Sequence, residues 1–103
     1  MKIVFARLAL LEIAHEVQWY ERRLRGLGED FERELDAKLE RIAQAPSAFR
    51  TTPEDARARR APMRRFPFWI VFRETSEAIV VVAFAHKKKR PGYWSRRLRA
   101  AAP

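Results

Sequence analysis

The stretch from Ala78 to Ala85 constrains the fold more than any other, because all eight of its residues are apolar. Eight residues are too few to cross a bilayer, which takes about 20 in a helix. A strand that is apolar on both faces must be covered on both sides, so this segment is predicted at the centre of a sheet. The rest of the chain must then supply neighbouring strands and a layer that packs on them.

Two segments before this strand show helical periodicity, one from about residue 9 and one from about residue 29. Their apolar faces are predicted to be Ile13, Val17, Tyr20 and Leu24 in the first, and Phe31, Leu35, Leu39 and Ile42 in the second. Gly26 and Gly28 predict a tight connection between them, and Pro46 ends the second helix. We therefore expect an antiparallel helix hairpin whose apolar faces pack on the sheet.

Three further segments are strand candidates. Ile3 to Leu8 opens the chain, Arg57 to Arg65 is basic and contains Pro62, and Phe68 to Arg73 is aromatic and β-branched. The proline predicts an edge or bulged strand. The order predicts one α+β domain over residues 1–103: an N-terminal strand, a helix hairpin, then a three-stranded antiparallel meander (β-α-α-β-β-β), with the helices on one face. The first strand could pair beside the last.

Composition excludes several classes of protein. The 103 residues are 48% hydrophobic, which is enough for a packed core, and they include no cysteine and two histidines. Disulfide scaffolds, thiolate zinc sites and cysteine nucleophiles are therefore excluded, and we expect neither a metal site nor a cofactor. Neither a signal peptide nor a membrane span is apparent, so we expect a cytoplasmic protein with no membrane partner.

The net charge of +9 is concentrated in the second half of the chain. Residues 1–49 contain 8 basic and 9 acidic residues, whereas residues 50–103 contain 14 basic and 4 acidic ones. The basic residues are clustered: Arg57, Arg59 and Arg60; Arg64 and Arg65; Lys87 to Arg90; Arg96, Arg97 and Arg99. Such a half-chain field attracts a polyanion or an acidic protein.

Several motifs in this order resemble the ParE/RelE superfamily of type II toxin–antitoxin toxins, on the ParE-like side that includes plasmid stabilisation proteins. They are Trp19-Tyr20-Glu21, Leu27-Gly28-Glu29-Asp30-Phe31, Glu34-Leu35-Asp36, Ile42 to Pro46, Arg64-Arg65-Phe66-Pro67-Phe68, Ala85-His86 and Arg90-Pro91-Gly92-Tyr93-Trp94. The resemblance implies a cytoplasmic bacterial toxin and an acidic, ParD-like or similar antitoxin that wraps around it in a heteromeric complex. ParE-like members poison DNA gyrase, and RelE-like members cut mRNA in the ribosome.

Fold alone does not decide between these two activities. Cleavage of RNA needs a base, an acid and a cation on the phosphate, for which the candidates are His86, Tyr93 and Arg65. However, nuclease relatives usually carry a basic residue where this chain has Trp69, and no acidic residue follows Glu77. The interpretation we favour is a gyrase inhibitor that acts by binding and has no catalytic residues. An mRNA endonuclease, a non-catalytic nucleic-acid-binding module and a degenerate, inactive toxin are the alternatives.

Binding residues follow from charge and aromatic character. The target is expected to contact the basic clusters, namely Arg64, Arg65, Lys87, Lys88, Lys89, Arg90, Arg96 and Arg97. The antitoxin is expected to contact Trp19, Tyr20, Arg59 and Arg60. Trp94 is predicted to be a core residue, and Tyr93 and Trp94 are predicted to fold back over the sheet edge.

Overall fold

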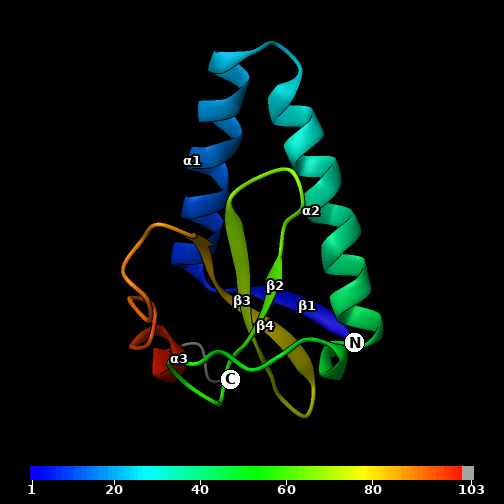
Figure 1. The fold of residues 1–103 in the computed structure, drawn as a ribbon. Helices are drawn as coiled ribbons and strands as arrows, with labels where there is room; N and C mark the ends of the chain where they lie inside the picture. Colours follow the sequence, from blue (N-terminus) through cyan, green and yellow to red (C-terminus); the bar gives the residue numbers. More distant parts are fainter. Residues whose placement is uncertain (101–103) are drawn as a thin grey trace.

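Two long helices lie on one face of an open four-stranded sheet in the computed structural model, which describes residues 1–100 (Figure 1). In chain order the elements are β1 (Lys2–Phe5), α1 (Arg7–Arg23), α2 (Leu27–Gln44), the 3₁₀ turn η1 (Pro46–Ala48), β2 (Arg59–Pro62), β3 (Phe68–Glu74), β4 (Ala78–His86) and α3 (Arg97–Ala100). The predicted α+β class and element order are confirmed. Residues 101–103 of the predicted domain lie outside the described residues.

The apolar strand β4 is central, as predicted. The strand order is β1-β4-β3-β2, in which β1 runs parallel to β4 and the other neighbouring pairs are antiparallel. The first strand therefore does pair beside the last, with Lys2 opposite Ala78 and Phe5 opposite Val81. The proline-containing β2 forms the sheet edge, where the missing N–H of Pro62 is tolerated.

The first strand is shorter than expected, and the first helix begins earlier. The last pairing bond of β1 runs from the Ala6 N–H to the Val81 carbonyl, at 2.9 Å. Ala6 is extended and forms the N-cap of α1, so Arg7 and Leu8 belong to the helix and not to the strand. This start places Leu8 and Leu11 on the solvent side of α1, where both are exposed.

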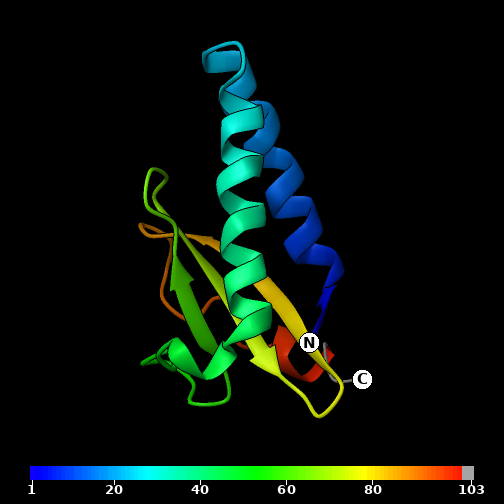
Figure 2. The ribbon, with the colours of Figure 1, turned by 90° about the vertical axis from the view of Figure 1, so that its right-hand side faces the viewer.

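The helix hairpin closes through a close backbone contact at two glycines. Gly26 has φ +88°, a left-handed conformation that glycine adopts without strain. A Cβ on Gly28 would lie 2.7 Å from the Val17 carbonyl oxygen, so only glycine lets α2 approach α1 this closely. The Glu21 carboxylate accepts hydrogen bonds from the N–H groups of Gly26 and Gly28, at 3.0 Å each, and so caps α2. The hairpin tip projects beyond the sheet (Figure 2).

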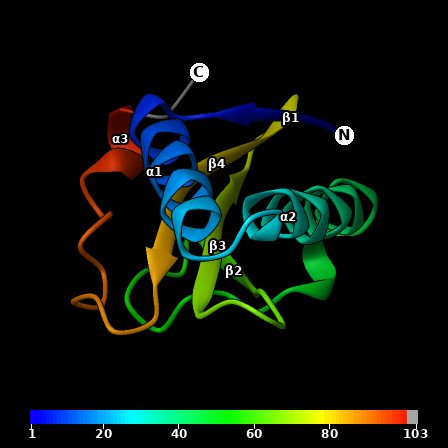
Figure 3. The same ribbon diagram turned by 90° about the horizontal axis from the view of Figure 1, so that it is seen from above.

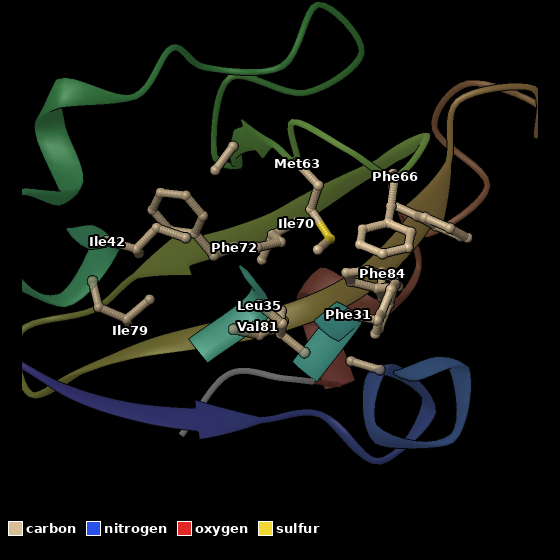
Figure 4. Close-up of a cluster of buried hydrophobic side chains, with 13 residues drawn as sticks. Phe31, Leu35, Ile42, Met63, Phe66, Ile70, Phe72, Ile79, Val81 and Phe84 are labelled. Atoms are coloured by element: carbon tan, nitrogen blue, oxygen red, sulfur yellow. The ribbon is translucent and has the colours of Figure 1, made fainter. Parts of the chain in front are cut away.

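The main core lies between the helices and the sheet, as the view from above shows (Figure 3). Phe31, Leu35 and Ile42 of α2 pack on the inward residues of the two central strands, whose alternation is interrupted by a register shift at Val71/Phe72 (Figure 4). These strand residues are Phe68, Ile70, Phe72, Ile79, Val81 and Phe84. The predicted apolar face of the second helix is thereby confirmed.

A second, smaller core covers the opposite face of the sheet. Trp94 and Leu98, from the segment around α3, pack against the outward residues of β3 and β4. Trp94 is only 3% exposed, so its predicted place in the core is confirmed. It covers a face of the sheet, however, and not the edge that the sequence suggested. Because both faces of β4 are covered, all of Ala78–Ala85 is buried.

Candidate binding surface

Two of the predicted basic clusters leave the same end of the sheet but line different hollows. β4 ends at His86 and continues into Lys87–Arg90, while the β2–β3 loop carries Arg64 and Arg65. The Lys87 N–H donates to the Pro67 carbonyl at 2.9 Å, which joins the start of β3 to the end of β4. From there the β2–β3 loop and the segment after β4 extend to opposite sides, as the view from above shows (Figure 3). Side chains separated by more than 20 residues in sequence thus lie on two sides of one end of the sheet.

The loop arginines are partly neutralised by α2. The Glu34 carboxylate accepts hydrogen bonds from the backbone N–H groups of both Arg64 and Arg65. The Arg65 guanidinium lies 3.8 Å from the Asp30 carboxylate. In contrast, Lys87–Arg90 form no ion pair with any residue in the described part of the chain. The exposed positive charge is therefore greatest just after β4.

Arg97 is engaged within the protein. Its guanidinium donates two hydrogen bonds to the Glu12 carboxylate, at 2.8 and 3.0 Å, and a third to the Val82 carbonyl at 3.1 Å. Its side chain is 17% exposed. Of the two arginines predicted in this tail to contact the target, only Arg96 is exposed.

Glu12 is a central residue that the sequence did not reveal. Besides Arg97, it accepts hydrogen bonds from the Tyr93 hydroxyl at 2.6 Å and from the Phe84 N–H at 3.0 Å. Burial raises the pKa of Glu12, but the bonds from Arg97, Tyr93 and Phe84 and the Arg97 charge outweigh it, so the pKa lies below its ordinary value. In the sequence, Glu12 is marked only by its place off the apolar stripe of α1. Its hydrogen-bond partners are 72 or more residues away, so no short-range pattern indicates them.

A small cavity of about 90 Å³ opens beside the basic segment on the sheet face that carries Trp69. The Arg60 guanidinium lies over the Trp69 ring, with Cζ 4.0 Å from the ring centre, and the Lys87 ammonium lies 4.9 Å from it. Both contacts have cation–π geometry. His86 and Tyr93 also line this cavity.

The three candidate residues for RNA cleavage do not converge on this cavity. His86 and Tyr93 line it, whereas Arg65 lies on another hollow with Asp30 and Glu34. The Lys88 N–H donates to His86 Nδ1 at 3.0 Å, which occupies the lone pair of that nitrogen. Burial and the hydrogen bond to Glu12 raise the pKa of Tyr93, so its hydroxyl stays protonated at neutral pH. Neither group is free to act as a base in this arrangement.

Of the residues expected to contact an antitoxin, some are exposed and others already contact the rest of the protein. Trp19 is 40% exposed, with the Arg23 guanidinium 4.2 Å from its ring centre. Tyr20 instead stacks on Phe31 in the main core. Arg59 donates to the Phe49 carbonyl at 2.6 Å.

A groove of about 360 Å³ runs between α1 and the segment after β4. Leu8 and Leu11 line it from the helix side, and both are about half exposed. Phe84 forms part of its apolar wall, and Lys89 adds a positive charge at its margin. The sequence analysis missed the two leucines because they lie outside the helix face that packs on the core.

Residues 3–91 match the family described as the ParE toxin of the type II toxin–antitoxin system parDE. The chain belongs to this ParE toxin family. A solved structure from P. aeruginosa, described as a chromosomal ParDE TA system, has the same fold, with a TM-score of 0.70. It is 18% identical in sequence, and the match covers 84% of this chain and 95% of that one. No curated protein matches the sequence significantly.

Membership of the ParE toxin family agrees with the arrangement of the sheet and the helix hairpin. No helix within residues 1–100 is both long and apolar enough to cross a membrane. Among these residues there is also no group of three or more metal-ligating side chains. This member of the ParE family presents three features suited to binding, which are the basic segment, the cavity beside Trp69 and the apolar groove of α1.

Proposed function

We propose that this member of the ParE toxin family arrests growth by binding DNA gyrase in the cytoplasm, and that a cognate antitoxin neutralises it. The observation that carries the proposal is the basic segment Lys87–Arg90, which is exposed and forms no ion pair within residues 1–100. A surface of this kind speeds encounter with an anionic partner and helps to select it.

The residues beside the basic segment favour inhibition by binding over catalysis of RNA cleavage. The nuclease relatives that the sequence resembles usually carry a basic residue where this chain has Trp69, and an indole neither neutralises charge nor transfers a proton. Tyr93 is held by Glu12, and Nδ1 of His86 is held by the Lys88 N–H. A binding inhibitor needs neither Tyr93 nor His86 to be free, whereas the RNA cleavage considered from the sequence would use one of them to transfer a proton.

The antitoxin is proposed to be acidic and amphipathic and to occupy the α1 groove. Leu8 and Leu11 would bury its apolar side chains, while Lys89 at the margin would pair with its carboxylates. The exposed ring of Trp19 would extend this contact toward the hairpin tip. Arg60, which also lies on the sheet edge, would contribute charge.

Two assays on the purified protein test the proposed target. Gyrase supercoiling should be inhibited, and cell-free translation should proceed normally. Replacing Lys87, Lys88, Lys89 and Arg90 by Ala should reduce the inhibition at least about tenfold, because close charge pairs at interfaces contribute more than 1.4 kcal/mol. Inhibited translation with normal supercoiling would instead favour the mRNA endonuclease.

The control removes the same number of charges elsewhere. Lys2, Arg7, Arg22 and Arg25 are exposed and lie on β1, α1 and the hairpin turn. Their replacement by Ala should leave inhibition of gyrase within about twofold of the unmodified protein. Circular dichroism of both variants establishes that they fold. Equal loss in the two variants would show that net charge, and not the Lys87–Arg90 segment, determines the effect.

A further inference from the structure

We propose that the cavity beside Trp69 binds a phosphate group of duplex DNA, with Arg60 and Lys87 as its ligands. The inference rests on the proposed function, because gyrase holds DNA and a toxin bound to it would meet both protein and duplex. It goes beyond that function by assigning the nucleic acid, and not the protein, to this particular cavity.

Arg60 keeps its hydrogen-bond donors available for an anion. Its guanidinium lies over Trp69, with Cζ 4.0 Å from the ring centre, and this contact uses the cation's charge and none of its N–H groups as a hydrogen-bond donor to oxygen. Within residues 1–100 its side chain forms neither a hydrogen bond nor an ion pair with the protein. A stacked arginine with free donors loses little side-chain entropy when it binds a phosphate, and it can bind two oxygens at once.

Lys87, directly after β4, is the second cation beside Trp69. Its ammonium lies 4.9 Å from the centre of the same ring, and the backbone of Lys87 is fixed by its hydrogen bond to Pro67. Lys89 and Arg90 also line the cavity. One carboxylate, Glu54, lies at the wall, but it forms no ion pair within the described chain. Positive charge therefore predominates around the cavity.

The shape of the cavity favours a phosphate over a base. At about 90 Å³ it is small, and Arg60 already covers a face of the indole on which a base would stack. A site that holds phosphates and reads no base edges binds duplex DNA without sequence preference. Gyrase-bound DNA presents such a backbone whatever its sequence.

Fluorescence anisotropy with a labelled 20-bp duplex, over a range of salt concentrations, tests the inference on the full chain. Affinity should fall with salt, because each phosphate contact releases counterions. Because both side chains bind the same phosphate, Arg60→Gln with Lys87→Gln should reduce the salt slope by about 1 and weaken binding at least tenfold. The matched control, Arg22→Gln with Arg25→Gln, removes two exposed charges from the end of α1 and the turn that follows it, and should leave the slope unchanged within about 0.5.

Tryptophan fluorescence provides a second measurement, which reports whether DNA binds at the cavity. DNA should change the tryptophan fluorescence of the protein, and Trp69→Phe should reduce that change by more than half, because of the remaining tryptophans only the buried Trp94 also lines the cavity. Equal slopes for the two charge variants would overturn the proposal, as would an unchanged signal in Trp69→Phe. Tighter binding of polyglutamate than of the duplex at the same site would also overturn it, in favour of an acidic protein.

The outcome is independent of the gyrase result. Inhibition of supercoiling by a protein that does not bind the duplex would overturn the DNA site and leave the proposed function standing. Binding of DNA through Arg60 and Lys87 without inhibition of supercoiling would support the site and contradict the proposed function.

Discussion

At the scale of single residues, Glu12 joins more of the molecule than any other carboxylate in residues 1–100. From α1 it holds the backbone of β4 at Phe84, the Tyr93 hydroxyl and the Arg97 guanidinium. Its two oxygens thereby satisfy four donors in a partly buried site. An ionised carboxylate with these partners is more stable in the folded chain than in the unfolded one.

We predict that Glu12→Gln lowers the free energy of unfolding by about 1–3 kcal/mol at pH 7, because charge-assisted hydrogen bonds are lost. The folded pKa of Glu12 is lowered from 4.5. Its contribution is therefore complete above about pH 4.5 and is lost as pH falls through the lower folded value. Urea unfolding between pH 7 and pH 3 should show a weaker acid dependence in the variant.

Glu40→Gln provides the control for that experiment, because Glu40 is exposed on α2 and its side chain forms neither a hydrogen bond nor an ion pair within residues 1–100. Its stability should stay within about 0.5 kcal/mol of the unmodified protein. An acid dependence in Glu12→Gln equal to that of the unmodified protein would contradict the role given to this carboxylate.

At the scale of elements, β4 depends on two different layers. The helices cover one of its faces, and the segment around α3 covers the other through Trp94 and Leu98. This segment contains one helical turn and is also held by the bond from Arg73 to the Leu98 carbonyl, at 2.9 Å. It is therefore part of the folded domain and not an appended basic tail.

Trp94→Ala is expected to destabilise the protein by about 3–5 kcal/mol, because it leaves a cavity against the outward face of β4. For a domain of this size the loss corresponds to a fall in Tm of more than about 10 °C. Trp19→Ala, at the exposed tip of the hairpin, should lower Tm by only a few degrees. Thermal unfolding followed by circular dichroism compares the two, and equal falls would show that the second core contributes little.

Elements were predictable where their signal is local. The period of Phe31, Leu35, Leu39 and Ile42 indicates a helix and its buried face, and the wholly apolar Ala78–Ala85 run indicates a central strand. The bonds of Glu12 and the face covered by Trp94 were not predictable in this way. They depend on which distant segments meet, and no short-range pattern records that.

The same distinction holds for the candidate site. Charge clustering placed Lys87–Arg90 on an exposed surface, and the structure agrees. Charge clustering could not distinguish these exposed residues from Arg97. Whether a basic side chain stays exposed or forms a partly buried ion pair depends on whether a carboxylate from a distant segment reaches it, as Glu12 reaches Arg97. Leu8 and Leu11 were overlooked because a sequence does not show which apolar residues remain uncovered after the distant segments have packed.

At the scale of the whole molecule, two surfaces of different chemistry meet along one wall. His86, Lys89 and Tyr93 line both the cavity beside Trp69 and the apolar groove of α1. A ligand in the groove therefore lies directly beside the basic cavity. Under the proposed function, an antitoxin could block the target by occupying the groove alone.

Leu8→Ser with Leu11→Ser is predicted to weaken antitoxin binding at least tenfold, because it removes the apolar anchors of the groove. Growth arrest by the variant should persist, and co-expressed antitoxin should no longer relieve it. Leu24→Ser, which also changes an exposed leucine but at the far end of α1, should bind antitoxin normally. Calorimetry with purified antitoxin measures the difference, and equal affinities in all three proteins would exclude the groove.

The parallel pairing of β1 with β4 also affects how the chain can assemble during synthesis. Lys2 pairs with Ala78, and the hydrogen-bond donors to Glu12 are synthesised up to 85 residues after it. The helix hairpin is local and forms early, whereas contacts between distant segments form late. A nascent chain on the ribosome therefore has no complete sheet, and the cavity beside Trp69 does not yet exist. Until Trp94, the last residue that lines this cavity, has been synthesised, the growing polypeptide lacks the site at which we propose that it binds DNA.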